Sequence, residues 1–376
     1  MLSKLFTIAA IALTAVHAQT ASTFAFTETY PTSGSKPTPK AEWVTEMNAG
    51  SIAAAPVLKE SGSNGPKQTG SGDTYCDWTF TGCTRATDIV ACPKGQWGIT
   101  YDDGPTQFSS KLYDFLDTTK QKATLFMIGG QVVQYPELVK RAFDSGHELA
   151  IHTWSHSYLT TLSNEQIAAE LKWTELAIKE VTGVSPRFFR PPYGDIDDRV
   201  RDIAKNLGFT PVIWNHDTDD WMLAESTSFK ESWVDGNATQ WANNAATSTV
   251  GGVSLEHDLY EKTVDAAIRI LPILQKAYSV TTVGACSGQA SYKEGSVPVK
   301  NATSSAVPSA ASSAGISSGI AGPSSAGPNS SSAASSSGVI AAGSASQAAL
   351  DSGAAGVAKP VFATLALVAV AASYLA

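Results

Sequence analysis

Residues 96–105 have the sequence QWGITYDDGP, in which an apolar run typical of a β-strand ends directly on two aspartates and a Gly-Pro pair. A second such run, 148–151, ends on the sequence HTWSH at 152–156. Strand-like and helix-like patterns alternate between and after these two stretches. Because strand followed by helix, repeated, is typical of a parallel sheet wrapped by helices, the pattern predicts an α/β fold.

The bounds of the expected elements follow from apolar periodicity and from the positions of proline and glycine. The strongest helix is 163–182, which opens with Ser163 and Gln166 in capping-box spacing and ends before Gly183. The expected strands are 96–101, 123–128, 148–151, 187–189, 210–214, 250–255 and 279–283, and the other helices are 109–119, 136–144, 197–207 and 259–277.

This order predicts a trimmed or distorted (β/α) barrel, because about 190 residues hold it and the usual barrel needs roughly 250. An open doubly wound sheet is the alternative. No Gly-x-Gly-x-x-Gly turn follows the first strand to favour that fold.

The composition restricts the possible partners. The 376 residues include 26 basic and 34 acidic residues, a formal net charge of −8. An acidic chain without a cluster of basic residues offers no positively charged surface for a phosphate backbone, so we expect no nucleic-acid partner. Residues 301–350 contain no charged side chain and consist mainly of Ser, Ala and Gly, so we interpret 291–351 as an O-glycosylated stalk without a packed core.

Both ends of the chain have processing patterns. Lys4 and the apolar run after it, with small residues before position 19, predict a secretory signal peptide over 1–18. Small residues from Ser352, followed by an apolar run to the last residue, predict a glycosylphosphatidylinositol (GPI) anchor signal over 352–376 with attachment at Ser352. A short tail anchor is the alternative. The chain is then expected to be secreted, and to be held at the cell membrane and cell wall by its lipid.

Secretion gives the cysteines and sequons a consistent interpretation. Four cysteines in an oxidising compartment allow three disulfide connectivities, of which we favour Cys76 with Cys83 and Cys92 with Cys286. Zinc binding by these cysteines is the rival interpretation, but no Cys-x-x-Cys pair exists. The predicted N-glycosylation sites are Asn237, Asn301 and Asn329.

Residues 19–75 are rich in Thr, Ser, Pro and Gly. We predict a linker or N-terminal extension with one short helix near Trp43 and Met47. The folded domain is expected over 76–290, and the sequence assigns no function to the extension.

Polar groups follow five of the expected strands. In a (β/α) barrel the C-terminal ends of the strands meet at one face, where catalytic residues gather from different strands. We therefore expect five separate segments to converge there. They are 100–104 (TYDDG), 152–156 (HTWSH), 190–194 (RPPYG), 217–221 (DTDDW) and 255–257 (LEH).

The residue types in these segments favour metal-assisted hydrolysis. Two imidazoles and a carboxylate, here His152, His156 and Asp103 or Asp102, are a common ligand set for a catalytic divalent metal. Adjacent strand residues point in opposite directions, so one aspartate can bind the ion while the other accepts a proton from the attacking water. His257 could donate a proton to the leaving group.

The five segments resemble, in order, the motifs of the polysaccharide deacetylases, carbohydrate esterase family four. The likeness spans about half of the chain, and one departure is Tyr101, where the family more often has Phe. Members with a secretion signal, a Ser-rich stalk and a GPI anchor are typical chitin deacetylases of fungal cell walls. The resemblance therefore implies a chitin deacetylase of that layout.

The resemblance also implies roles for individual residues. Asp102 would be the general base, and Asp103, His152 and His156 would hold a divalent ion, zinc or alternatively cobalt. His257 would be the general acid and would pair with Asp220, for which Asp217 and Asp219 compete. Arg190 would orient Asp102, the backbone N–H of Tyr193 would stabilise the oxyanion, and Trp221 and Leu255 would line the pocket for the acetyl methyl group.

The sequence hypothesis is thus hydrolysis of N-acetyl groups from N-acetylglucosamine units of cell-wall chitin or its oligomers, giving chitosan and acetate. The alternatives are deacetylation of acetylxylan or peptidoglycan, or a wall-anchored glycan-binding protein without turnover. We expect a monomer.

Overall fold

The computed structural model describes residues 24–60, 65–68 and 72–295 of the chain. Several predicted features lie outside these residues. They are the signal peptide, the anchor signal with Ser352, nearly all of the stalk, and the sequons at Asn301 and Asn329. Asn237 is described and lies in a helix, with its side-chain amide donating to the Thr218 carbonyl over 3.4 Å.

The strands are short, and all of their pairings are parallel. One sheet has the order β7-β8-β1-β9 and the other the order β2-β3-β4-β5-β6. Every residue of β3, β4 and β8 is buried, as expected for parallel strands covered on both faces. The strands are β1 (Gln96–Gly98), β2 (Thr100–Asp102), β3 (Thr124–Met127), β4 (Glu148–Ile151), β5 (Phe188–Phe189), β6 (Thr210–Pro211), β7 (His216–Asp217), β8 (Gly252–Leu255) and β9 (Ser279–Thr281).

The two sheets are joined into a barrel by two continuous runs of chain. Only Ile99 separates β1 from β2, so the run 96–102 pairs with β8 through β1 and with β3 through β2. The run 210–217 likewise pairs with β5 through β6 and with β8 through β7. The ladder therefore closes on itself, which confirms the distorted (β/α) barrel.

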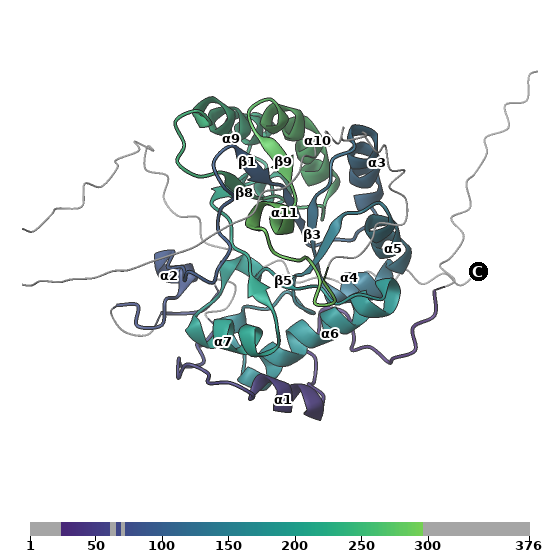
Figure 1. Ribbon diagram of the computed structural model, residues 1–376, viewed down its shortest axis with the longest axis vertical. Helices are drawn as coiled ribbons and strands as arrows, with labels where there is room; N and C mark the ends of the chain where they lie inside the picture. The colour runs from purple at the N-terminus through teal and green to yellow at the C-terminus, as the bar shows by residue number, and fades with distance from the viewer. Residues whose placement is uncertain (1–23, 61–64, 69–71, 296–376) are drawn as a thin grey trace, which may run out of the picture. The chain divides into compact units, whose positions relative to one another are not determined.

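Helices surround the strands (Figure 1). The helices at 109–119 and 136–144 have the predicted bounds, and the capping box of Ser163 and Gln166 is present at the start of α6. Within the described part of the chain, no helix is long and apolar enough to cross a membrane. The helices around the barrel are α3 (Ser109–Thr119), α4 (Gly129–Gln134), α5 (Pro136–Asp144), α6 (Asn164–Thr182), α7 (Asp198–Asn206), α8 (Met222–Glu225), α9 (Glu231–Asn244), α10 (Glu261–Gln275) and α11 (Val283–Ser287).

Several elements differ from the sequence prediction. The strand expected over 210–214 ends at Pro211, and β7 was not predicted. The strand expected over 279–283 ends at Thr281, because Thr282 caps the N-terminus of α11 by accepting a hydrogen bond from the Ala285 N–H. Helices α4, α8, α9 and α11 were not predicted. In α9 only Val234 and Ala238 are buried, so this helix lacks the apolar stripe on which such predictions depend.

The N-terminal extension packs on the barrel instead of forming a free linker. Its helix α1 (Ala41–Met47) lies where a short helix was predicted, and it buries Trp43 and Met47 in the main hydrophobic cluster. Ala53 donates its N–H to the Asp202 carboxylate over 2.9 Å. The described residues of the extension are thus part of the folded unit.

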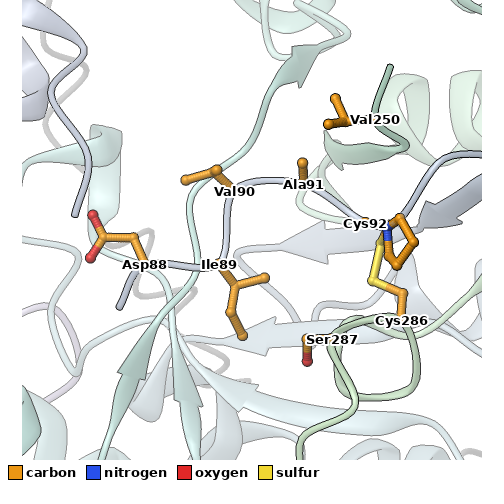
Figure 2. Close-up of a pocket in the computed structure, with 9 residues that line it drawn as sticks. Asp88, Ile89, Val90, Ala91, Cys92, Val250, Cys286 and Ser287 are labelled. Atoms are coloured by element: carbon orange, nitrogen blue, oxygen red, sulfur yellow. A yellow bond between two sulfur atoms is a disulfide. The ribbon is translucent and has the colours of Figure 1, made fainter. Parts of the chain in front are cut away.

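Both predicted disulfides are present. Cys76 is bonded to Cys83 within a short loop that contains α2 (Trp78–Thr81), whereas Cys92 and Cys286 connect the start of the barrel to α11 near its end. A pocket of about 370 Å³ lies beside the second disulfide and is lined by Ile89, Val250 and neighbouring residues (Figure 2). No residue of the five motifs lines this pocket.

Candidate active site

The barrel brings the five motif segments together at the C-terminal ends of its strands. Asp102 is the last residue of β2, and Asp103 follows it. His152 follows β4 directly, Arg190 follows β5, and His257 comes two residues after the end of β8. Parallel strands deliver their C-terminal ends to one face of a barrel, so residues far apart in the sequence become neighbours.

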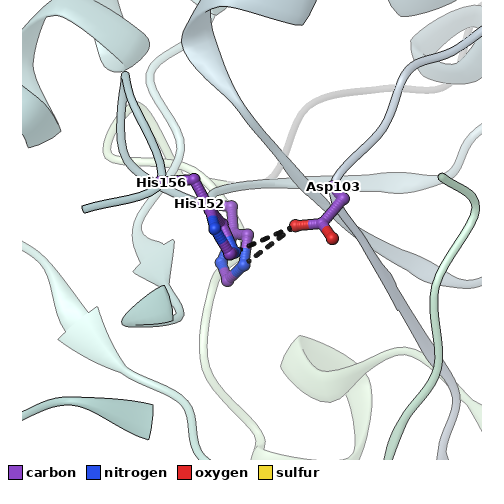
Figure 3. Close-up of side chains that lie close together, drawn as sticks. All are labelled: Asp103, His152 and His156. Atoms are coloured by element: carbon purple, nitrogen blue, oxygen red, sulfur yellow. Dashed lines mark ion pairs between the residues drawn. The ribbon is translucent and has the colours of Figure 1, made fainter. Parts of the chain in front are cut away.

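Asp103, His152 and His156 form a cluster that could hold a metal ion (Figure 3). The Oδ1 atom of Asp103 lies 3.3 Å from Nε2 of His152 and 3.3 Å from Nε2 of His156. This oxygen is buried and has no hydrogen-bond partner among the described residues. A buried carboxylate oxygen facing two imidazole nitrogens fits a divalent cation such as zinc, which takes N and O ligands and leaves a position for water.

The other ring nitrogen of each histidine has a partner. Nδ1 of His152 lies 2.8 Å from the carbonyl oxygen of Arg190, and Nδ1 of His156 lies 3.0 Å from the hydroxyl of Tyr193. A carbonyl can only accept, so His152 carries its proton on Nδ1 and leaves the lone pair of Nε2 directed at Asp103. Such partners fix the tautomer and orientation of metal-binding histidines.

The loop between the two histidines is held in an unusual backbone conformation. Thr153 and His156 have positive φ angles of 63° and 58°, and Asp103 and Tyr193 also have positive φ. For residues other than glycine this conformation costs about 1 kcal/mol or more and persists only when surrounding contacts enforce it.

Glu170 of α6 supplies those contacts. Its buried carboxylate accepts hydrogen bonds from the N–H groups of Trp154 and Ser155, each over 2.8 Å, and from the Ser155 hydroxyl. Glu170 is not among the site residues predicted from the sequence. Its spacing from Ile167 and Thr174 places it on the core-facing side of α6, and this position could have indicated a buried carboxylate with a structural role.

Asp102 is paired with Arg190 in the barrel interior. The Nη1 atom of Arg190 donates to Oδ1 of Asp102 over 2.8 Å and to the Thr100 hydroxyl over 2.7 Å, and Asp102 and Arg190 are fully buried. Burial raises the pKa of Asp102, and the Arg190 guanidinium partly offsets that rise. The pair leaves a carboxylate beside the metal cluster, since Oδ2 of Asp102 lies 3.9 Å from Nε2 of His152.

His257 is paired with Asp220, and not with either of the competing aspartates. Nδ1 of His257 lies 2.7 Å from Oδ1 of Asp220, and the His257 backbone N–H donates to Oδ2 over 2.9 Å. Burial lowers the pKa of His257, but the Asp220 carboxylate outweighs it with help from Asp103 and Asp102, and the pKa rises to about 10. Asp217 instead accepts from the Asp219 N–H.

The pKa values of two cluster residues are shifted in a way that favours cation binding. Burial raises the pKa of Asp103, yet His156 and His152 outweigh it, so this pKa lies below its usual range. Burial lowers the pKa of His156 to about 4. An ionised carboxylate and a neutral imidazole are the forms that bind a cation.

Three further predicted site residues differ in exposure. Leu255 is buried at the end of β8, Trp221 is half-buried just before α8, and Tyr193 is exposed, with its ring stacked on Tyr158 at 4.0 Å between centroids. The Tyr193 hydroxyl contacts His156, a relationship that the sequence analysis did not anticipate.

Comparison with known proteins places these features in a family. Residues 90–212 match the family model described as polysaccharide deacetylase. The chain is 45% identical over 231 residues to chitin deacetylase 1 of Cryptococcus neoformans var. grubii, covering 58% of this chain and 49% of that protein. It is 34% identical over 220 residues to chitin deacetylase 1 of Saccharomyces cerevisiae, covering 58% of this chain and 69% of that protein.

The solved structure of the chitin deacetylase from Colletotrichum lindemuthianum aligns with a TM-score of 0.50 and 28% identity, over 55% of this chain and 95% of that one. The chain spans about half the length of the Cryptococcus relative. The family model covers β1 to β6 and the first three motif segments, and the Saccharomyces relative is matched over 69% of its length, so the chain belongs to the polysaccharide deacetylase family.

Proposed function

We propose that the protein hydrolyses the N-acetyl groups of N-acetylglucosamine units in chitin, which releases acetate and leaves chitosan. The observation that carries this proposal is the convergence of Asp103, His152 and His156 next to two polar pairs, Asp102 with Arg190 and His257 with Asp220. The relatives named chitin deacetylases, at 34% to 45% identity, support chitin as the substrate.

Asp103, His152 and His156 would hold the divalent cation, for which we propose zinc. When bound, the cation supplies Lewis acidity, which polarises the acetyl carbonyl and lowers the pKa of a water molecule. Asp102 accepts the proton of the attacking water as oxygen bonds to the acetyl carbon. Arg190 holds the Asp102 carboxylate in place, because it occupies one carboxylate oxygen and leaves the other facing the site.

His257 supplies the proton for the second half of the reaction. With a pKa raised to about 10 it is an imidazolium at neutral pH, and Asp220 holds its Nδ1 so that Nε2 carries the transferable proton. When the bond between carbonyl carbon and nitrogen breaks, this proton moves to the sugar nitrogen. The products are acetate and a glucosamine unit.

The remaining proposed contacts concern the substrate. The backbone N–H of Tyr193 would donate to the oxyanion of the tetrahedral intermediate. Leu255 and Trp221 would line the pocket for the acetyl methyl group. Leu255 ends β8 two residues before His257, and Trp221 follows Asp220 at the start of α8, so the methyl group would lie on the acid side of the site.

Acetate release distinguishes the substrates. The secreted protein is incubated with chitin oligomers, acetylated xylan and peptidoglycan fragments, with and without chelator and then with zinc restored. We expect release from chitin oligomers, its loss on chelation and its return with zinc. Release only from one of the other two glycans would reassign the substrate, and binding of chitin without any release would leave a glycan-binding protein.

We also propose the processing and placement of the chain. The signal peptide over 1–18 and the anchor signal over 352–376 would be removed, and the catalytic domain over 76–290 would stand on the stalk over 291–351. The protein would be a glycosylated monomer at the cell membrane and wall. Release of the protein from membranes by phosphatidylinositol-specific phospholipase supports the anchor, and resistance to it contradicts the anchor.

A further inference from the structure

The N-terminal strap, which consists of residues 24–60 and 65–68, contacts the loop that joins the two metal-site histidines. This loop, residues 153–156, lies on the barrel between β4 and α6. The family model begins only at residue 90, so the strap lies outside the matched region. It contacts Trp154 within the loop and Tyr158 and Thr160 just after the loop, so the contacts lie on both sides of His156.

Before His156, the strap meets Trp154, which is fully buried. The ring of Tyr30 stacks on the Trp154 ring with 5.8 Å between centroids and 7° between planes. The Trp154 indole N–H donates to the Thr32 carbonyl over 3.3 Å. Trp154 also packs on Gly129, where an added Cβ would come within 2.4 Å of the ring. Trp154 is thus fixed between the barrel and the strap.

After His156, the strap meets Tyr158 and the residues behind it. A Cβ added at Gly65 would lie 2.8 Å from the Tyr158 ring, so the strap backbone packs directly against that ring. Tyr158 stacks on Tyr193, whose hydroxyl lies 3.0 Å from Nδ1 of His156. The Leu58 N–H also donates to the Thr160 carbonyl over 2.9 Å.

We propose that the strap is a positioning element of the metal site, acting through Trp154 on one side of His156 and through Tyr158 and Tyr193 on the other. Glu170 holds the same loop from the inside through three hydrogen bonds. His156 has a positive φ, and Thr153 does too, so the loop needs restraint from both sides to keep Nε2 of His156 directed at Asp103.

Tyr30 is the residue that tests this role. In the full-length secreted protein, Tyr30→Ala removes the ring from Trp154, and Tyr30→Phe keeps the ring while removing the hydroxyl that donates to Glu180 over 2.6 Å. The matched control is Met47→Ala. Met47 is a strap residue that is 1% exposed and lies at α7, where Asn206 donates to its carbonyl, away from the loop.

The readout is the affinity of the metal-free protein for Zn²⁺, measured by competition with a chelator, together with the melting temperature. We expect Tyr30→Ala to weaken Zn²⁺ binding by about 10-fold. This is the lower end of the range seen when a residue that supports a metal ligand is removed. Met47→Ala should lower the melting temperature and leave Zn²⁺ affinity unchanged, and Tyr30→Phe should bind like the parent. Tyr30→Leu serves the same comparison if Tyr30→Ala does not fold.

Parental Zn²⁺ affinity in the Tyr30→Ala or Tyr30→Leu protein would overturn the inference, as would an equal loss in Met47→Ala. The inference rests on the proposed metal site, and the parent protein separates the two. A parent that binds no Zn²⁺ refutes the site and the inference together, whereas a parent and a Tyr30 variant that bind it equally well refute only the inference.

Discussion

Asp102 and His257, which lie far apart in the sequence, are held side by side by backbone hydrogen bonds. The Asp102 N–H donates to the carbonyl of Glu256 over 2.9 Å, and the Asp258 N–H donates to the carbonyl of Asp102 over 3.1 Å. The proposed base and the proposed acid therefore belong to one parallel bridge between β2 and the end of β8. Their spacing depends on the barrel and not on a mobile side-chain contact.

Asp102→Asn should strongly reduce catalysis while keeping the metal. Asparagine can still accept the Arg190 hydrogen bond, but it cannot take a proton from water, so we expect kcat to fall by about 100-fold or more. Zn²⁺ binding is measured on the same sample and should stay near the parental value. His152→Ala is the contrasting variant and should lose both. Undiminished acetate release by Asp102→Asn would remove Asp102 from its role.

Asp220→Asn should move the basic limb of the pH dependence of kcat/KM to lower pH. The Asp220 carboxylate is the largest influence raising the pKa of His257 to about 10, so its neutralisation lets the imidazolium deprotonate earlier. Activity at alkaline pH then falls first, while activity near neutral pH changes less. Asp219→Asn is the control. It removes a charge of the same sign at the neighbouring residue, whereas the hydrogen bond to His257 comes from Asp220, so the basic limb of this variant should stay at the parental pH.

Asp77→Asn should stabilise the protein above neutral pH. Burial and the neighbouring carboxylates of Asp195 and Asp197 raise the pKa of Asp77 from its ordinary value of 3.8 to about 7. Between these two values the folded state binds more protons than the unfolded state, so stability falls as pH rises through that window. Asparagine keeps the N-cap bond from the Thr79 N–H and carries no charge.

The gain from Asp77→Asn should be on the order of a few kcal/mol well above that window and much smaller at its acid end. Melting temperatures at one alkaline and one acidic pH provide the check. A gain of the same size at both would show that the effect does not come from the ionisation of Asp77.

Removing the long disulfide should destabilise the protein more than removing the short one. The bonded cysteines are 194 residues apart in the first case and 7 in the second. In the chain-entropy model the two bridges contribute about 5 and about 2 kcal/mol by restricting the unfolded chain. Urea unfolding of the Cys92→Ala/Cys286→Ala and Cys76→Ala/Cys83→Ala proteins compares them, and a larger loss in the second would contradict that order.

Helices α5, α6 and α7 could be predicted from sequence because local chemistry determines their ends. Ser163 and Gly183 bound α6, Asp197 caps α7, and Pro136 begins α5. In contrast, β7 was not predicted, because it contains only two residues and its pairing with β8 depends on barrel closure. Such short strands have no periodicity of their own to read.

The proposed site residues could be identified from motif order, together with the pairing of Arg190 with Asp102 and the favoured pairing of Asp220 with His257. Three aspartates were available to His257, and only the fold places Asp220 within 2.7 Å of it. The Thr, Ser, Pro and Gly content of the strap predicts a linker. The strap instead contacts the barrel through scattered aromatic rings and through the carbonyls of Thr32 and Thr38, which accept from the indoles of Trp154 and Trp173. Every residue has a backbone carbonyl, so the sequence does not indicate which carbonyls accept a hydrogen bond.

The packing of Tyr30 and Trp43 has a practical consequence for recombinant production. A shortened version that starts at the first disulfide, Cys76, would uncover the faces of Trp154 and Trp173 against which these two rings pack. Large indoles exposed on a protein surface promote aggregation. The smallest useful expression boundary therefore lies before Tyr30, well upstream of residue 90, where the match to the family model begins.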